Sequence, residues 1–200
     1  MIHIKRQILA ATMVAGVLAA SAGVAHAAGG AANVSLAAGS ISLTGATPGD
    51  FSANLSGSDQ TVSTTLSTYS VSDARGNAAG WHVTFQASSF SCTSVDSGCP
   101  VSGDTLPSGS LLMAPPTVAC HSGTSCSGRA SPPVISVSSN TALDTGTAVT
   151  VASAAAKEGM GTFDFTPGTI GGGNLQLTVP SYAYATTYHS TLTVSAISGP

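Results

Sequence analysis

Apolar and polar positions alternate along several short segments of this chain, which is the pattern of half-buried β-strands. The clearest segment is WHVTFQA, residues 81–87. Its apolar face consists of Trp81, Val83, Phe85 and Ala87. Two further segments near the end of the chain, 174–180 and 186–197, show the same alternation. They predict two closing strands.

Shorter strand-like segments occur at 40–45, 50–57, 64–73, 132–139, 147–153 and around Phe163 and Phe165. Residues 154–160 offer one helical turn at most. Glu, Lys, Gln and Arg are scarce, whereas Thr and Val, which favour strands, are common. We therefore predict an all-β fold, a single β-sandwich of Ig-like or Greek-key type with about eight or nine short strands.

The segment 74–80, ARGNAAG, separates the strand predicted at 64–73 from the one at 81–87. Its glycines permit a tight reversal, so the simplest interpretation is a hairpin with Trp81 pointing into the core. Stacking of a glycan on Trp81 is the functional alternative. The turn also holds Asp73 and Arg75, for which we weigh stabilisation of the turn against a binding role.

The first residues have the three parts of a secretory signal. Lys5 and Arg6 supply the positive start, an apolar stretch follows, and Ala25-His26-Ala27 fits the cleavage rule. We predict a signal peptide at 1–27, a flexible lead-in at 28–38 and one domain at 39–200. The protein is then extracellular, at the cell wall or cell surface, without a membrane span after cleavage.

Charge excludes several kinds of partner. After residue 27 the only bases are Arg75, Arg129 and Lys157, whereas the chain has eight acids. Nucleic acids and anionic membranes attract clustered Lys and Arg, which this chain lacks. We expect no nucleic-acid partner.

Four cysteines lie in a Ser-, Gly- and Pro-rich stretch, which we interpret as a long insert at about 91–133. In an exported chain, Cys92, Cys99, Cys120 and Cys126 are expected to form disulfides. Local pairing, Cys92–Cys99 and Cys120–Cys126, is favoured because each bond closes a short loop. Pairing of Cys92 with Cys120 and Cys99 with Cys126 is the main competitor, and the spacing does not suit zinc.

Catalytic chemistry leaves no clear signature. The serines form no Gly-x-Ser-x-Gly motif, and Glu158 is the only glutamate. His82, His121 and His189 have no metal-ligand spacing, and solvated imidazoles are the simplest interpretation of His82 and His189. We predict no enzyme, no metal and no cofactor.

Two stretches resemble the signatures of the WxL cell-surface domain family. YSVSDARGNAAGWHVTF, from Tyr69, resembles its first signature, a turn leading into Gly-Trp-x-Leu. LTVPSYAYATTYHSTLTVSAISGP, which ends the chain, resembles its close. The likeness is greatest to the actinobacterial type, but Val83 replaces the expected Leu, and Val194 stands about where a second Trp would be.

The resemblance implies a secreted, noncatalytic surface protein that associates noncovalently with peptidoglycan or another wall glycan, often alongside companion surface proteins. It makes Trp81, Val83, Arg75 and Asp73 the candidate binding residues. A structural or adhesive subunit that acts through protein–protein contacts is the alternative, because the surface is Ser/Thr/Ala-rich and nearly uncharged.

Overall fold

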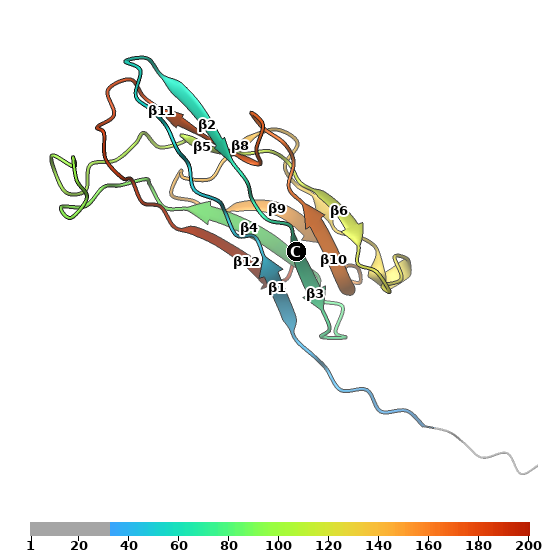
Figure 1. Ribbon diagram of the computed structural model, residues 1–200. Coiled ribbons are helices and arrows are strands. Elements are labelled where there is room, and N and C mark those ends of the chain that lie inside the picture. Colours follow the sequence, from blue (N-terminus) through green and yellow to red (C-terminus); the bar gives the residue numbers. More distant parts are fainter. Residues whose placement is uncertain (1–32) are drawn as a thin grey trace, which may run out of the picture. The chain divides into compact units, whose positions relative to one another are not determined.

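The computed structural model describes residues 33–200 (Figure 1). The predicted signal peptide and the first part of the lead-in lie outside the described residues. The chain divides into two units at residue 36, and every strand belongs to the second, Ala37–Pro200, which is compact. Residues 33–36 have no regular secondary structure.

The second unit is all-β, as predicted. Among the described residues its only helical element is a 3₁₀ turn, Gly128–Ala130, and residues 154–160 form no helix. The strands are β1 (Ile41–Gly45), β2 (Gln60–Thr64), β3 (Tyr69–Asp73), β4 (Trp81–Ala87), β5 (Leu111–Met113), β6 (Thr117–Cys120), β7 (Val134–Ile135), β8 (Thr141–Ala142), β9 (Val149–Ala154), β10 (Gly161–Thr166), β11 (Leu175–Val179) and β12 (Leu192–Ser198).

These twelve strands form three antiparallel four-stranded sheets, so the prediction of a single sandwich of eight or nine strands is wrong. The sheet orders are β1-β3-β10-β6, β2-β11-β5-β8 and β12-β4-β9-β7. The first two sheets use consecutive chain segments in the same order: β2 leads into β3, β5 into β6, and β10 into β11. Pro115 and Pro116 separate β5 from β6, and proline cannot donate to a ladder.

The segment 64–73, predicted as one strand, is interrupted. Thr64 is the last residue of β2, and β3 begins at Tyr69. Leu66, in the gap, is buried and forms an isolated bridge with Pro48. Residues 50–57, also predicted as a strand, lie in a loop. Phe51, Ala53 and Leu55 alternate with polar residues, as in a strand, but the segment pairs with no other strand.

The core lies between the sheet of β3 and β10 and the sheet of β4 and β9. Tyr69 and Phe165, paired partners on β3 and β10, stack with ring centroids 4.8 Å apart. Across the core, Phe85 lies 5.4 Å from Tyr69, and Trp81 lies 6.1 Å from Phe163. The alternating face predicted for residues 81–87 is therefore confirmed as core.

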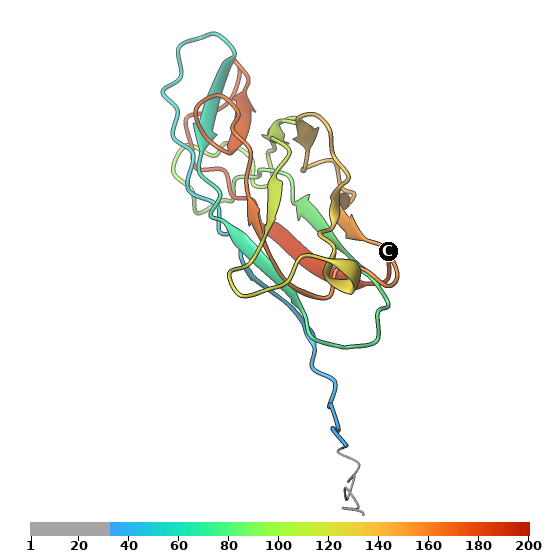
Figure 2. The ribbon, with the colours of Figure 1, turned by 90° about the vertical axis from the view of Figure 1, so that its right-hand side faces the viewer.

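The predicted hairpin of β3 and β4 is wrong, because these strands belong to different sheets. β3 pairs with β1 and β10, whereas β4 pairs with β12 and β9. The loop 74–80 crosses from one layer to the other instead of reversing within a sheet. In the view turned by 90°, this loop and the loop before β2 lie at opposite ends of the unit (Figure 2).

The stretch 91–133, predicted as a decorated connection, contributes two strands to the sheets. β5 supplies the buried side chains of Leu111 and Met113, and β6 forms the edge of the first sheet. Disulfides join Cys92 to Cys99 and Cys120 to Cys126, which is the local pairing. They close the loops on either side of β5 and β6.

Candidate functional site

Asp73 and Arg75, predicted as a turn pair or a binding pair, form a partly buried ion pair after β3. The carboxylate accepts bonds from Arg75 Nε at 2.8 Å, from Nη2 at 2.9 Å and from the Arg75 backbone N–H at 3.1 Å. The Asp73 side chain is 1% exposed and that of Arg75 is 12% exposed. Burial by itself raises the pKa of Asp73, but the hydrogen bonds and charge of Arg75 outweigh it and lower that pKa.

The Arg75 guanidinium also donates to the Gly80 carbonyl at 2.8 Å and to Ser198 Oγ. Gly80 precedes β4, and Ser198 ends β12. One arginine therefore joins the ends of β3 and β12 to the start of β4. Arg75 is therefore a half-buried residue that connects three strand ends.

Trp81 is 0% exposed, and Val83 on the same strand is equally buried. The indole N–H donates to the Gly159 carbonyl at 2.7 Å, and the ring packs against Phe163 and Phe165. A Cβ added at Gly159 would lie 2.8 Å from the indole nitrogen, so this position needs glycine. Neither Trp81 nor Val83 presents a face to a glycan in this structure.

The two sequence signatures meet in space. β4 and β12 pair along their full lengths, from Leu192 opposite Ala87 to Ser198 opposite Trp81. Val194, in the position expected for a second Trp, lies opposite Phe85 and packs against the core. The strands of the two signatures thus form one continuous framework.

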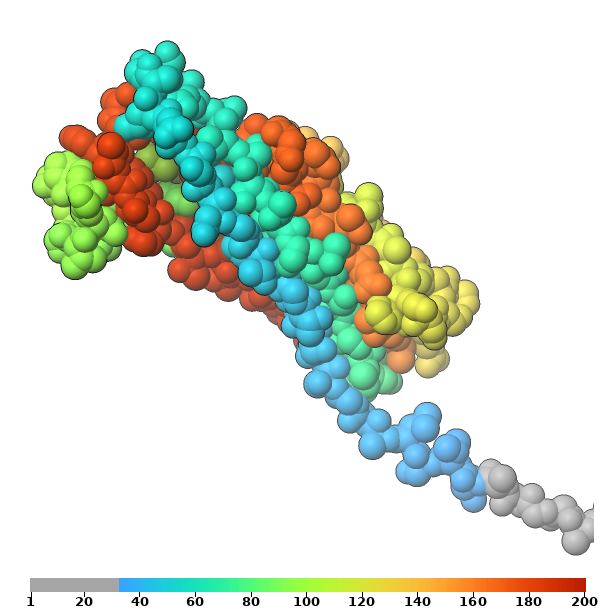
Figure 3. Space-filling model, in the orientation of Figure 1, coloured from blue at the N-terminus to red at the C-terminus, as the bar shows by residue number. Residues whose placement is uncertain are grey.

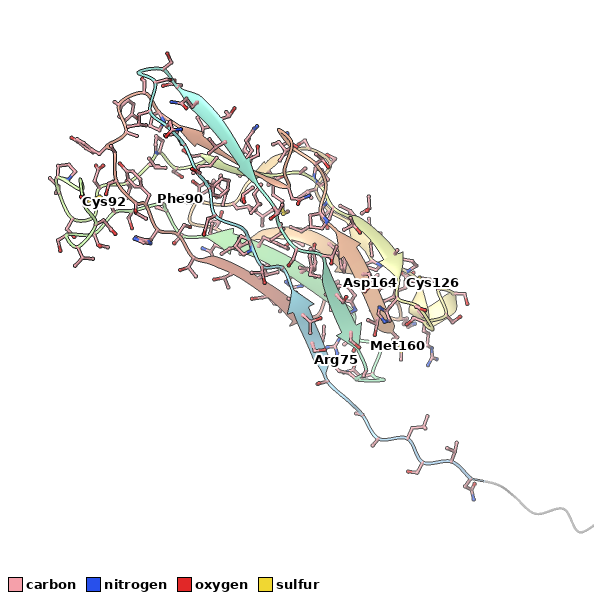
Figure 4. The ribbon with its side chains drawn as sticks, in the orientation of Figure 1. Arg75, Phe90, Cys92, Cys126, Met160 and Asp164 are labelled. Atoms are coloured by element: carbon pink, nitrogen blue, oxygen red, sulfur yellow. A yellow bond between two sulfur atoms is a disulfide. The ribbon has the colours of Figure 1, made fainter. Side chains whose placement is uncertain are left out.

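We call the region around Arg75, the 3₁₀ turn and residues 155–160 the motif end. Backbone bonds link Lys157 to Ala78 at 2.8 Å and Met160 to Arg129 at 2.9 Å. Figure 4 labels Arg75 and Met160 here, with Phe90 and Cys92 at the opposite end. All three bases that follow residue 27 are at the motif end.

Three loops far apart in sequence form the opposite end, which we call the tyrosine end: residues 51–59, 91–106 and 180–190. Phe51 and Phe90 pack edge to face with centroids 6.0 Å apart, and Asp59 accepts a bond from the Ser181 N–H at 2.8 Å. Ser91 and His189 exchange two backbone bonds. Figure 3 shows the three loops side by side, in cyan, green and red.

The loop 180–190 presents two aromatic rings to solvent. Tyr182 is 74% exposed and Tyr184 is 49% exposed. The Tyr184 N–H donates to the Tyr188 hydroxyl at 3.2 Å, and that hydroxyl donates to Asp104 at 3.3 Å. The tyrosines therefore stand on a loop that is hydrogen-bonded to its neighbour.

Two pockets flank this loop and share Pro180 and Tyr182 as a common wall. One, of about 310 Å³, continues over Asp59 and Ser110, and the other, of about 250 Å³, continues over Asp104. Asp144, which is buried, supports the first pocket by accepting the Ser110 N–H at 3.1 Å. No lysine or arginine of the described chain lines either pocket.

Two aspartates of the tyrosine end, Asp96 and Asp59, have lowered pKa values. Hydrogen bonds from His189, and then from Thr93, lower the pKa of Asp96 to about 2. The backbone bond from Ser181 lowers the pKa of Asp59. These aspartates therefore stay charged at neutral pH.

At the motif end, the carboxylate of Asp164 contacts both a histidine, His121, and a serine, Ser70. Ser70 donates to Asp164 at 2.6 Å, and His121 Nδ1 lies 2.9 Å from the same carboxylate. The carboxylate thus lies between the hydroxyl and the imidazole, whereas nucleophilic hydrolysis needs the imidazole to contact the hydroxyl.

Within residues 33–200, no three His, Cys, Asp or Glu side chains are grouped to hold a metal, and no helix could span a membrane.

A family model for the WxL domain, described as surface cell wall-binding, matches residues 33–197. The chain belongs to the WxL family. The comparisons with curated proteins and with solved structures gave no match. This WxL domain is a noncovalent cell-wall-binding module of the cell surface and not a member of a known catalytic family.

The predicted binding residues and the exposed aromatic surface of this WxL domain are at opposite ends. Asp73, Arg75, Trp81 and Val83 are brought together, but inside the framework. Sequence reasoning missed Tyr182, Tyr184 and the acids beside them. The available signal was the pair of tyrosines in PSYAY, residues 180–184, inside the closing signature stretch, where no strand pattern accounts for them.

Proposed function

We propose that this WxL chain is an exported, noncatalytic surface protein whose ligand in the wall is peptidoglycan. The family match over residues 33–197 carries the proposal, because it covers both signatures and the strands between them. The secretory leader supports export. With its single Trp, the chain is a divergent member that lacks the second Trp motif.

Sedimentation with isolated sacculi tests the proposal. Mature protein, residues 28–200, is mixed with sacculi from which wall proteins and phosphate-containing polymers have been removed, and the pellet is assayed. We expect the chain to sediment, to resist washing in high salt, and to elute in denaturant. An unrelated secreted protein of similar size and charge is the control.

Salt resistance follows from the charge distribution. After residue 27 the chain has only three lysine and arginine residues against eight acids, so attraction to anionic polymers does not drive binding, and screening by salt removes little of it. If the protein stays in the supernatant as completely as the control, peptidoglycan is not the ligand.

One observation favours a second role, as a subunit that contacts companion proteins. Leu55, Val95 and Val101 are exposed on the loops of the tyrosine end. Exposed apolar side chains gathered on one surface are typical of protein interfaces. Analytical ultracentrifugation across a wide concentration range tests self-association, and a strictly monomeric protein would contradict that form of the role.

A further inference from the structure

We propose that the tyrosine end binds the glycan strand of peptidoglycan, with sugar rings on Tyr182 and Tyr184 and their substituents in the two pockets. The inference rests on the proposed function, for which it names the surface and the ligand chemistry. It moves the binding surface away from the tryptophan signature to the opposite end of the domain.

The two tyrosines provide faces for stacking. Their rings are the most exposed aromatic side chains of the described residues. A tyrosine presents a large, rigid face with a polar tip, and only two torsions must be fixed on binding. A sugar ring likewise has an apolar CH face and polar edges, so the two surfaces are complementary.

The pockets beside the rings suit hydroxyl and acetamido groups. The larger, of about 310 Å³, is at the lower limit of the range for ligand sites, and the other, of about 250 Å³, is below it, so each suits a substituent and not a whole ligand. Asp59 lines one pocket and Asp104 the other, and a carboxylate accepts hydrogen bonds from hydroxyl and amide donors. Because both pockets share Pro180 and Tyr182, a chain of linked sugars can cross from one to the other.

The surface is ordered before a ligand arrives. Ser181 is bonded to Asp59, Tyr188 to Asp104, and His189 to Asp96 at 3.0 Å. The Cys92–Cys99 disulfide closes the loop that carries Asp96. A preformed surface loses little conformational entropy on binding, which favours weakly interacting ligands such as sugars.

Charge selects among the polymers of a cell wall. The pockets carry carboxylates, and the nearest bases of the described chain are at the motif end. A phosphate-rich polymer or the carboxylates of a stem peptide would be repelled. An uncharged glycan would not.

Nuclear magnetic resonance with labelled tyrosine tests the site directly. The chain has four tyrosines, and Tyr69 is buried in the core, so it is an internal reference. Peptide-free glycan strands are released from sacculi by an amidase, the lactyl carboxylates that this cleavage exposes are converted to neutral methylamides, and the strands are titrated into the mature protein. We expect the ring signals of Tyr182 and Tyr184 to shift while those of Tyr69 stay in place.

Variants test the same site on intact sacculi. Changing Tyr182→Ala together with Tyr184→Ala should weaken binding by about tenfold or more, whereas the two Phe substitutions should retain most of it. Ile197→Ala, an exposed apolar change on β12, is the matched control and should bind like the wild type. The fluorescence of Trp81, the only tryptophan, verifies that each variant is folded.

Each result decides between the alternatives. Sacculi that retain the folded double Ala variant fully would overturn the site while leaving the proposed function intact. Glycan strands that shift no tyrosine signal would also overturn it, as would competition by free stem peptides alone. A wild-type chain that does not sediment contradicts the proposed function, and the titration then still decides whether this surface binds glycan.

Discussion

Replacing Arg75 with alanine should destabilise the domain by about 2 to 4 kcal/mol. Removing one partner of a buried ion pair costs about 3 to 5 kcal/mol, because the other charge stays buried. The Asp73 side chain is 1% exposed, but Arg75 itself is 12% exposed, so part of the charge is solvated and the expected cost is about 1 kcal/mol below that range. The substitution also removes the bonds to Gly80 and Ser198.

Urea unfolding followed by Trp81 fluorescence measures the change in the free energy of unfolding. Arg129→Ala is the matched control, because Arg129 is exposed, and its cost should stay within about 0.5 kcal/mol. Asp73→Asn in the Arg75→Ala background removes the unpaired charge, so it should restore part of the loss.

The pH dependence gives an independent test. The pKa of Asp73 is lowered in the folded protein, so its ion pair stabilises the fold above the unfolded value of about 4. That stabilisation is lost as the pH falls through the folded-state pKa. The difference between the wild type and Arg75→Ala should therefore shrink as the pH falls below about 4.

A cost for Arg75→Ala as small as that for Arg129→Ala, at neutral pH, would refute the reasoning. It would mean that water reaches the Asp73 carboxylate and replaces the guanidinium.

Three further predictions concern the framework and the acidic end. Trp81→Ala should cost about 3 to 5 kcal/mol in urea unfolding and Trp81→Phe less, monitored by circular dichroism because both remove the fluorophore. Gly159→Ala should cost more than Gly76→Ala, because both glycines have φ near +70° but only Gly159 touches Trp81; equal costs would exclude the steric argument. The lowered pKa of Asp96 implies stability that is present above about pH 4 and lost toward pH 2, so Asp96→Asn should flatten this part of the stability profile.

Strands with strict alternation could be predicted from the sequence. The face of Trp81, Val83 and Phe85 and the closing strand with Leu175 and Leu177 are buried as expected. Alternation determines which face of a strand is buried, but it does not determine which strand lies beside it.

Pairing and layer assignment could not be predicted, for the same reason. A glycine-rich connection such as 74–80 fits a hairpin within a sheet as well as a crossing between layers. The guanidinium of Arg75 stabilises the connection 74–80 by donating a hydrogen bond to Ser198, which is more than a hundred residues further along the chain. Local sequence carries no record of such a contact.

The same limit explains why the candidate binding surface was missed while the family was found. A signature is visible in sequence when one short segment carries several constrained residues, and burial imposes such constraints on Trp81 and Gly80 at once. The tyrosine end is assembled from three loops, and each contributes one or two residues: Asp59 from the first, Asp104 from the second, Tyr182 and Tyr184 from the third. Each of these residues is ordinary in a surface loop, and only the fold brings them together. The first signature is therefore the part that builds the domain, whereas the surface that we propose for the wall has Tyr182 and Tyr184 within a signature stretch and takes its acids from loops outside both signatures.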